Sequence, residues 1–166
     1  MCDWICYLIY SLTSNCTYIG STNNFINRLN KHNTGKGAKY TKKNIPWIPI
    51  LTISGFHHKN ACLSFEAGWK KLSRCRANRR LNFINIMTDC CYCYTNDPKY
   101  NRIIDLLYFV NNFTLIDTKF KLNYDIKHPV FMPEELVMTI FMEDWIMDFP
   151  WPPFIEINFE LPRSDT

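Results

Sequence analysis

The chain has 166 residues, of which 47% are hydrophobic and 20% are charged, so it is long enough for one domain, or for one domain with a small appendage. It contains no run of 18 apolar residues, and Asp3 stands where a secretory signal would carry basic residues, so we expect neither a membrane span nor a signal peptide. The protein is therefore expected to be intracellular, with its eight cysteines reduced rather than joined in disulfides.

Charge is distributed unevenly along the chain. Residues 1–80 contain thirteen Lys and Arg but only two acids, Asp3 and Glu66, for a net charge of +11, whereas residues 81–166 contain six basic and thirteen acidic residues, for −7. A basic half is typical of a protein that binds a polyanion. We therefore predict a nucleic-acid-binding domain in residues 1–80. Residues 81–166 would form an acidic, mainly helical extension that packs on this domain, docks a partner or bounds a DNA channel.

Two apolar runs near the N-terminus, residues 4–10 and 16–20, predict a β-hairpin because they are rich in β-branched and aromatic side chains. If residues 11–14 form the loop, Tyr7 lies directly opposite Tyr18. Any loop with an even number of residues still places both phenols on one face of the hairpin, because side chains alternate along a strand.

Residues 22–33 predict a short helix, which Ser21 or Thr22 can cap. At about 100° per residue, Arg28 and His32 fall together on this helix, beside its apolar stripe. They form either a solvated pair or part of a functional site. The stripe consists of Phe25, Ile26 and Leu29.

Residues 34–47 lack apolar periodicity and predict a surface loop or a broken helix. This segment is either a solvated lysine-rich loop or a segment that follows a phosphate backbone, with Tyr40 interleaved among its basic residues. The basic residues are Lys36, Lys39, Lys42 and Lys43.

Residues 47–55 predict a third strand, and Pro46 and Pro49 favour an edge position or a late start for it. Residues 60–73 predict the next helix. Glu66 falls on its apolar face, where a carboxylate is costly unless it is paired or bound to a metal. It therefore either forms a salt bridge with a basic residue or binds a cation. The apolar face consists of Cys62, Leu63, Phe65, Trp69 and Leu72.

A basic run that includes Arg74 and Arg76 follows and is expected to contact DNA, and residues 102–113 then predict an apolar helix. Residues 133–147 predict an acidic amphipathic helix, and the proline-rich residues 150–153 are expected to end the ordered part. The inward side chains of these two helices are Ile103, Leu106, Leu107 and Val110 in the first, and Leu136, Ile140, Phe141 and Trp145 in the second. The spacing of Cys90, Cys91 and Cys93 is too tight for an ordinary zinc site.

The pattern of Tyr7, ten intervening residues and then Tyr18-Ile19-Gly20 resembles the signature of the GIY-YIG nucleases, with Ile5-Cys6-Tyr7 in the first position. The order of the later residues is most similar to the Slx-type structure-specific endonuclease subunit, and more loosely to the nuclease module of the UvrC family. The matching residues are Arg28, His32, the run 35–42, Pro46-Trp47, Gly55-Phe56 and Phe65-Glu66. The resemblance covers residues 4–75.

The resemblance implies an α+β fold, in which a small three-stranded antiparallel sheet is flanked by helices and followed by a C-terminal helical extension. It also implies a metal-dependent DNA endonuclease that is specific for flaps, forks or Holliday junctions and acts in DNA repair or recombination. Slx-type proteins generally continue into a zinc module rich in Cys and His, and no such pattern is present in this sequence.

The family's catalytic roles transfer to five residues. Tyr7 would accept a proton from the attacking water, which needs either a lowered phenol pKa or deprotonation coupled to the nearby metal and Arg28. Tyr18 would position water or phosphate, Arg28 would hold the scissile phosphate, and His32 would shuttle the proton. Glu66 would bind one Mg²⁺ or Mn²⁺ ion, because a single carboxylate suits a metal that keeps most of its waters.

Two alternatives to an active nuclease stay open. In the first, the chain is a catalytically silent DNA-binding module, as the unmatched Ile5 and Cys6 suggest. In the second, it is an adaptor that works through its acidic half, by binding a regulatory protein or by self-association. The expected location is the nucleus or, for a large DNA virus, the cytoplasmic site of DNA replication.

Overall fold

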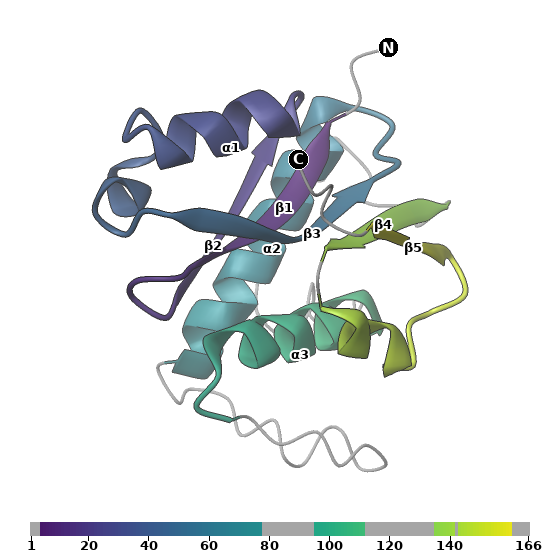
Figure 1. The fold of residues 1–166 in the computed structure, drawn as a ribbon. Coiled ribbons are helices and arrows are strands. Elements are labelled where there is room, and N and C mark those ends of the chain that lie inside the picture. Colours follow the sequence, from purple (N-terminus) through teal and green to yellow (C-terminus); the bar gives the residue numbers. More distant parts are fainter. Residues whose placement is uncertain (1–3, 78–94, 112–134, 142, 161–166) are drawn as a thin grey trace.

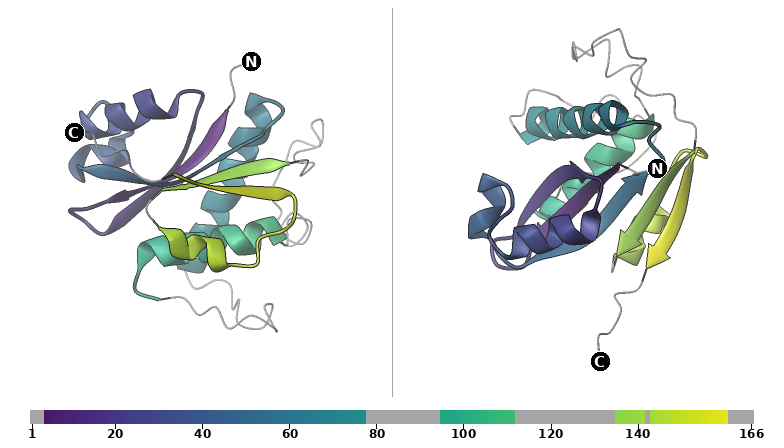
Figure 2. Two further views of the ribbon diagram at one scale, coloured as in Figure 1. Left: turned by 45° about the vertical axis from the view of Figure 1, so that its right-hand side comes forward. Right: turned by 90° about the horizontal axis from the view of Figure 1, so that it is seen from above.

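The computed structural model describes residues 4–77, 95–111, 135–141 and 143–160. They form an α+β fold around a mixed five-stranded sheet with strand order β2-β1-β3-β4-β5 (Figure 1). Helix α1 lies on one face of the sheet, and helices α2 and α3 lie on the other (Figure 2). The predicted fold class is confirmed, but the sheet has five strands instead of three, and not all of them are antiparallel.

The predicted hairpin is formed by β1 (Ile5–Ser11) and β2 (Cys16–Thr22). The predicted register is wrong, because Tyr7 lies opposite Gly20 and Tyr18 lies opposite Ile9. The loop begins one residue later than predicted, because the Ser11 hydroxyl accepts backbone hydrogen bonds from Thr13 and Ser14. The loop still has an even number of residues, so the prediction that both phenols share one face is confirmed.

Helix α1 (Phe25–Asn33) begins later than predicted, because β2 continues to Thr22. The helix is capped by Asn24, whose side chain accepts a hydrogen bond from the backbone N–H of Asn27. Phe25 and Leu29 pack toward the sheet as predicted. Ile26 was predicted to be buried with them, but its side chain is 75% exposed.

Strand β3 (Trp47–Ser54) pairs with both β1 and β4, so the predicted edge position is wrong. Pro49 lies where the β1–β3 register shifts, and β4 pairs only with residues 51–54, beyond that proline. The half of β3 that contains Pro49 therefore has no partner strand on the β4 side among the described residues. This arrangement suits proline, which cannot donate a ladder hydrogen bond.

Helices α2 (Lys59–Ala77) and α3 (Pro98–Asn111) bury their apolar side chains against the same sheet face, with Leu8 of β1 in the core between them. The predicted inward residues are buried, except Leu63, which is 39% exposed. The buried residues confirmed in these two helices are Cys62, Phe65, Trp69, Leu72, Ile103, Leu106, Leu107 and Val110.

The helix predicted for residues 133–147 is wrong, because this region contains strand β4 (Leu136–Phe141) and the short 3₁₀ helix η3 (Asp144–Asp148). Leu136 and Ile140 are nevertheless buried, since residues four apart share a face in a strand as well as in a helix. The ordered part also continues past residues 150–153 into β5 (Ile155–Glu160), which is parallel to β4.

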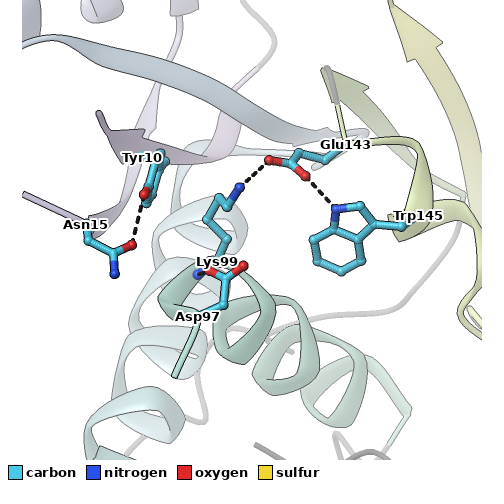
Figure 3. A network of polar contacts seen from close by, with 6 residues as sticks. All are labelled: Tyr10, Asn15, Asp97, Lys99, Glu143 and Trp145. Atoms are coloured by element: carbon cyan, nitrogen blue, oxygen red, sulfur yellow. Dashed lines mark hydrogen bonds and ion pairs between the residues drawn. The ribbon is translucent and has the colours of Figure 1, made fainter. Parts of the chain in front are cut away.

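A polar network joins the hairpin to the second half of the chain (Figure 3). The Nζ atom of Lys99 on α3 lies 2.5 Å from Glu143 and 5.0 Å from the ring centroid of Tyr10 on β1. Glu143 also accepts a hydrogen bond from the Trp145 indole, and the Tyr10 hydroxyl donates to Asn15 in the hairpin loop at 2.8 Å. The network thus links β1, α3 and the segment that follows β4.

The predicted domain boundary near residue 80 and the cysteines at 90, 91 and 93 lie outside the described residues. Within the part of the chain that the structure describes, no helix is both long and apolar enough to cross a bilayer.

Candidate active site

Tyr7 is the centre of the candidate site. Alternation along β1 sends Cys6 and Leu8 into the main core and turns Tyr7 toward α1, where its side chain is fully buried. The tyrosine hydroxyl lies over Gly20 of β2, because a Cβ atom built on Gly20 would lie 2.4 Å from the Tyr7 oxygen. Glycine at this position therefore leaves the space that the phenol fills.

Two side chains of α1 hold the Tyr7 hydroxyl. The Nε of Arg28 donates a hydrogen bond to it at 3.0 Å, and the Nε2 of His32 lies 2.9 Å from it. His32 is fully buried and Arg28 is half-buried, so the two residues do not form the solvated pair considered as an alternative. The helical spacing predicted that they lie together, and the structure brings both to Tyr7.

Burial shifts the pKa values of both Tyr7 and His32. It raises the pKa of the Tyr7 phenol well above its usual value near 10, and the hydrogen bond and charge of Arg28 oppose this shift only in part. Burial therefore works against the lowered phenol pKa that was considered from the sequence. Burial, and then the charge of Arg28, lowers the pKa of His32 to about 4. Near pH 7 the site thus contains a neutral phenol beside a neutral imidazole.

Two further tyrosines extend the site toward solvent. The ring centroid of Tyr18 lies 6.3 Å from that of Tyr7 and 5.2 Å from that of His32. Tyr40 stacks on Tyr18 at 6.3 Å with an interplanar angle of 22°, and it is 54% exposed. The ring of Tyr18 thus lies between the buried ring of Tyr7 and the solvent-exposed ring of Tyr40.

Glu66 reaches the site from α2. Its carboxylate forms an ion pair with Lys70, four residues later on the same helix, so the salt bridge considered as an alternative is present. The Lys70 Nζ also lies 5.2 Å from the ring centroid of Tyr18. The charge of Glu66 also contributes to the raised pKa of Tyr7, after the larger effect of burial.

The donors at the site suit some metals better than others. The described residues contain no group of three or more His, Cys, Asp or Glu side chains that could hold a metal ion together. Zinc sites normally take three or four protein ligands, whereas Mg²⁺ usually keeps several waters and binds one or two carboxylates. Glu66 therefore fits a hydrated Mg²⁺ or Mn²⁺ ion, provided that Lys70 releases the carboxylate.

The lysines predicted to bind DNA lie close to this site. They flank or belong to the 3₁₀ helix η1 (Lys39–Lys43), whose buried Thr41 contacts His32. All four lysines, at positions 36, 39, 42 and 43, are exposed. Arg74 is exposed on α2, the helix that carries Glu66, and the side chain of Arg76 lies outside the described part of the structure.

Sequence reasoning missed Thr41 and Lys70 as members of the site. Thr41 was one uncharged residue within a lysine-rich run, and no local pattern marks it as a partner of His32. Lys70 stands four residues after Glu66, a spacing that favours an ion pair on any helix. That spacing could have identified Lys70 as the partner of Glu66.

The family model for the GIY-YIG catalytic domain matches residues 3–81, a range that includes Tyr7, Arg28, His32 and Glu66. The chain belongs to the GIY-YIG nuclease superfamily. The resemblance predicted from the residues is confirmed, including its likeness to Slx-type nucleases.

The relatives of this GIY-YIG chain differ in how much of it they share. The Uncharacterized protein L300 of Acanthamoeba polyphaga mimivirus is 59% identical over 159 residues, which are 93% of this chain and 95% of L300. The structure-specific endonuclease subunit SLX1 of Malassezia globosa is 44% identical over 71 residues, covering 41% of this chain and 16% of that protein. SLX1 of Cryptococcus neoformans var. neoformans (strain JEC21) is 38% identical over 105 residues, covering 60% of this chain and 21% of that protein. The chain thus spans less than a quarter of these two SLX1 proteins.

Proposed function

We propose that this protein is a divalent-metal-dependent endonuclease that hydrolyses phosphodiester bonds in branched DNA, such as flaps, forks and Holliday junctions. The observation that carries the proposal is the Tyr7 hydroxyl, held between the Arg28 guanidinium and the His32 imidazole. The preference for branched DNA is supported by the SLX1 relatives, which are named structure-specific endonuclease subunits.

Phosphodiester hydrolysis needs an activated water, neutralisation of phosphate charge and help for the leaving oxygen. Tyr7 would accept the water proton while its own proton passes to His32 Nε2, 2.9 Å away. This coupled transfer never requires a free phenolate, so it is compatible with the raised pKa of Tyr7.

The remaining groups would act on the phosphate. Arg28 uses its Nε for Tyr7, and its other N–H groups can hold phosphate oxygens. Tyr18 also interacts with Arg28 and would position the guanidinium or the phosphate. Glu66 would hold one Mg²⁺ or Mn²⁺ ion, which when bound supplies positive charge to the phosphate and the leaving oxygen.

The segment around η1 would bind the DNA backbone. Its four exposed lysines would contact phosphates, the exposed Tyr40 ring would stack on a base, and Arg74 and Arg76 would add further contacts. Replacing Lys36, Lys39, Lys42 and Lys43 together should weaken binding to many DNA sequences alike and flatten its salt dependence. An unchanged salt slope would exclude this segment from the interface.

The biological setting is part of the same proposal. A nuclease for branched DNA would act in repair or recombination, in the nucleus or at a cytoplasmic site of viral replication. The mimivirus relative supports the viral setting. Residues 1–80 would perform the cleavage, and the acidic residues 81–166 would bind a regulatory protein or a second copy of the chain.

A cleavage assay tests this function. The purified protein is incubated with labelled flap, fork, Holliday-junction and linear duplex DNA, with Mg²⁺, Mn²⁺ or EDTA, and Tyr7→Phe serves as the control for contaminating nucleases. We expect cleavage of the branched substrates only, lost in EDTA and in the variant. Binding to DNA without cleavage under any metal would instead support the catalytically silent module, and neither binding nor cleavage would support the adaptor.

A further inference from the structure

Thr41 is a fully buried residue of η1 that makes two hydrogen bonds through its hydroxyl. Its Oγ1 donates to the backbone carbonyl of Ala38 at 2.9 Å and lies 2.6 Å from the Nδ1 of His32. A hydroxyl has only one proton to donate. A carbonyl oxygen can only accept, so the arrangement that satisfies both contacts has the hydroxyl donating to Ala38 and the Nδ1–H of His32 donating to Thr41.

In this arrangement, the two hydrogen bonds of the Tyr7 hydroxyl have defined directions. With its proton on Nδ1, a neutral His32 presents the lone pair of Nε2 to Tyr7, so the Tyr7 hydroxyl donates to it. Arg28 Nε–H donates to the same hydroxyl oxygen. In the other tautomer, an N–H would face Tyr7 and the lone pair of Nδ1 would face Thr41, whose single proton could then satisfy only one of its two contacts.

The backbone holds Thr41 firmly in this position. Its N–H donates to the carbonyl of Ala38 at 2.9 Å, and its carbonyl accepts from the Trp47 indole at 2.9 Å. Gly37 allows the close approach, because a Cβ atom there would lie 2.5 Å from His32 Nδ1 and 2.9 Å from Thr41 Oγ1.

We propose that Thr41 is a positioning residue for DNA cleavage, which holds His32 in the tautomer whose Nε2 accepts the Tyr7 proton. The inference rests on the proposed function, in which His32 receives that proton. Thr41 itself does not contact the reacting atoms. Its hydroxyl acts through the imidazole.

Substitution and NMR test the tautomer without any DNA or metal. Thr41→Val keeps the shape of the side chain and removes the hydroxyl, and Thr41→Ser keeps the hydroxyl. The control Thr17→Val removes another buried hydroxyl, which accepts a hydrogen bond from Arg102. Long-range ¹H–¹⁵N spectra, assigned with His32→Gln, show which His32 nitrogen carries the proton. We expect Nδ1 in wild type, Thr41→Ser and Thr17→Val, and a shift toward Nε2 in Thr41→Val. An unchanged tautomer in Thr41→Val would overturn the proposal.

Single-turnover cleavage with the same variants tests whether the tautomer matters. Thr41→Val should cut about 10- to 10⁴-fold more slowly at unchanged DNA affinity. The lower figure is the loss of one hydrogen bond, and the upper figure is the effect of a wrong histidine tautomer in a serine protease triad. Thr41→Ser should stay within a few fold of wild type, and a wild-type rate in Thr41→Val would refute the positioning role.

A failure of the proposed function can be told apart from a failure of the Thr41 proposal. If the wild-type protein cuts no DNA, the proposed function fails, and the NMR arm alone decides whether Thr41 sets the tautomer. If circular dichroism shows that Thr41→Val is unfolded, Thr41→Ala provides the same two measurements.

Discussion

The two faces of the sheet bury side chains equally well but by different means. On the face covered by α2 and α3, β1 contributes Leu8 to a large apolar cluster, where shape and area hold the residues together. On the face covered by α1 and η1, the buried residues Tyr7, His32 and Thr41 are held by directed hydrogen bonds. We therefore expect a substitution in the apolar cluster to lower the free energy of unfolding. A substitution at Tyr7, His32 or Thr41 should instead lower the cleavage rate.

The largest effect is expected for Glu66, which belongs to a core-packed helix yet reaches the site. Glu66→Gln should abolish Mg²⁺-dependent cleavage, a loss of more than about 10³-fold, because a catalytic metal supplies several kcal/mol. DNA binding should survive, since the basic face is intact. A cleavage assay and a DNA-binding assay measure these two effects, and calorimetric titration with Mn²⁺ measures the loss of metal binding.

The control for Glu66 is Lys70→Gln, which breaks the same ion pair but keeps the carboxylate. It should retain cleavage and Mn²⁺ binding. Equal defects in both variants would instead show that Glu66 matters only as the partner of Lys70.

The second effect concerns the two tyrosines that share a face. Tyr7→Phe should slow cleavage by about 10²- to 10⁴-fold, as expected for a lost proton acceptor, whereas Tyr18→Phe should cost only the 0.5–1.5 kcal/mol or so of a neutral hydrogen bond. Single-turnover rates from about pH 6 to 10 measure both. If Tyr7→Phe cuts at nearly the wild-type rate while His32→Ala is inactive, the base is His32 and not Tyr7.

Leu8 provides the contrasting substitution, next to Tyr7 but on the other face. Leu8→Ala should lower the free energy of unfolding by about 2–5 kcal/mol, because it leaves a cavity in the core. Its cleavage rate per folded molecule should match wild type. Urea unfolding and single-turnover cleavage at low temperature separate the two quantities, and a specific loss of rate in Leu8→Ala would show that the two faces are not independent.

The last prediction is a dependence of stability on acid pH. His32 has a pKa of about 4 in the folded protein against 6.5 in the unfolded chain, so the unfolded state binds more protons between these values. Stability should therefore fall as pH decreases from 6.5 to 4, by about 3 kcal/mol. Urea unfolding at pH 7 and 4.5 measures this change. His32→Gln should lose this part of the acid sensitivity, and an identical pH profile in the variant would assign the effect to other groups.

Local patterns predicted much of the fold. The hairpin, the helices around residues 25–33 and 59–77 and the strand from Trp47 all follow from alternation, capping or helical spacing. Two of the failed predictions have clear physical reasons. The spacing of Leu136 and Ile140 fits both a strand and a helix, and the hairpin register depended on hydrogen bonds to the Ser11 side chain, which no hydrophobic pattern contains.

The site was predictable where one element or one motif contains it. Strand alternation predicted that Tyr7 and Tyr18 share a face, and helical spacing predicted that Arg28 and His32 lie together, but their roles in a site came from the resemblance to the GIY-YIG nucleases. The contact between Thr41 and His32 was not predictable, because it forms only where η1 packs against α1. The raised pKa of Tyr7 is likewise a consequence of tertiary burial.

The pairing of β3 with β4 has a consequence for how this family domain can exist. A fragment limited to the matched residues 3–81 would leave residues 51–54 of β3 as an open sheet edge and would uncover the apolar side of α2 that α3 packs against. It would also lose the hydrogen bond from Arg102 to Thr17 in the hairpin. Open edges recruit other strands, so we expect the excised fragment to aggregate. In this chain, β4 and α3 from the acidic half therefore cover surfaces that the matched residues alone would leave exposed.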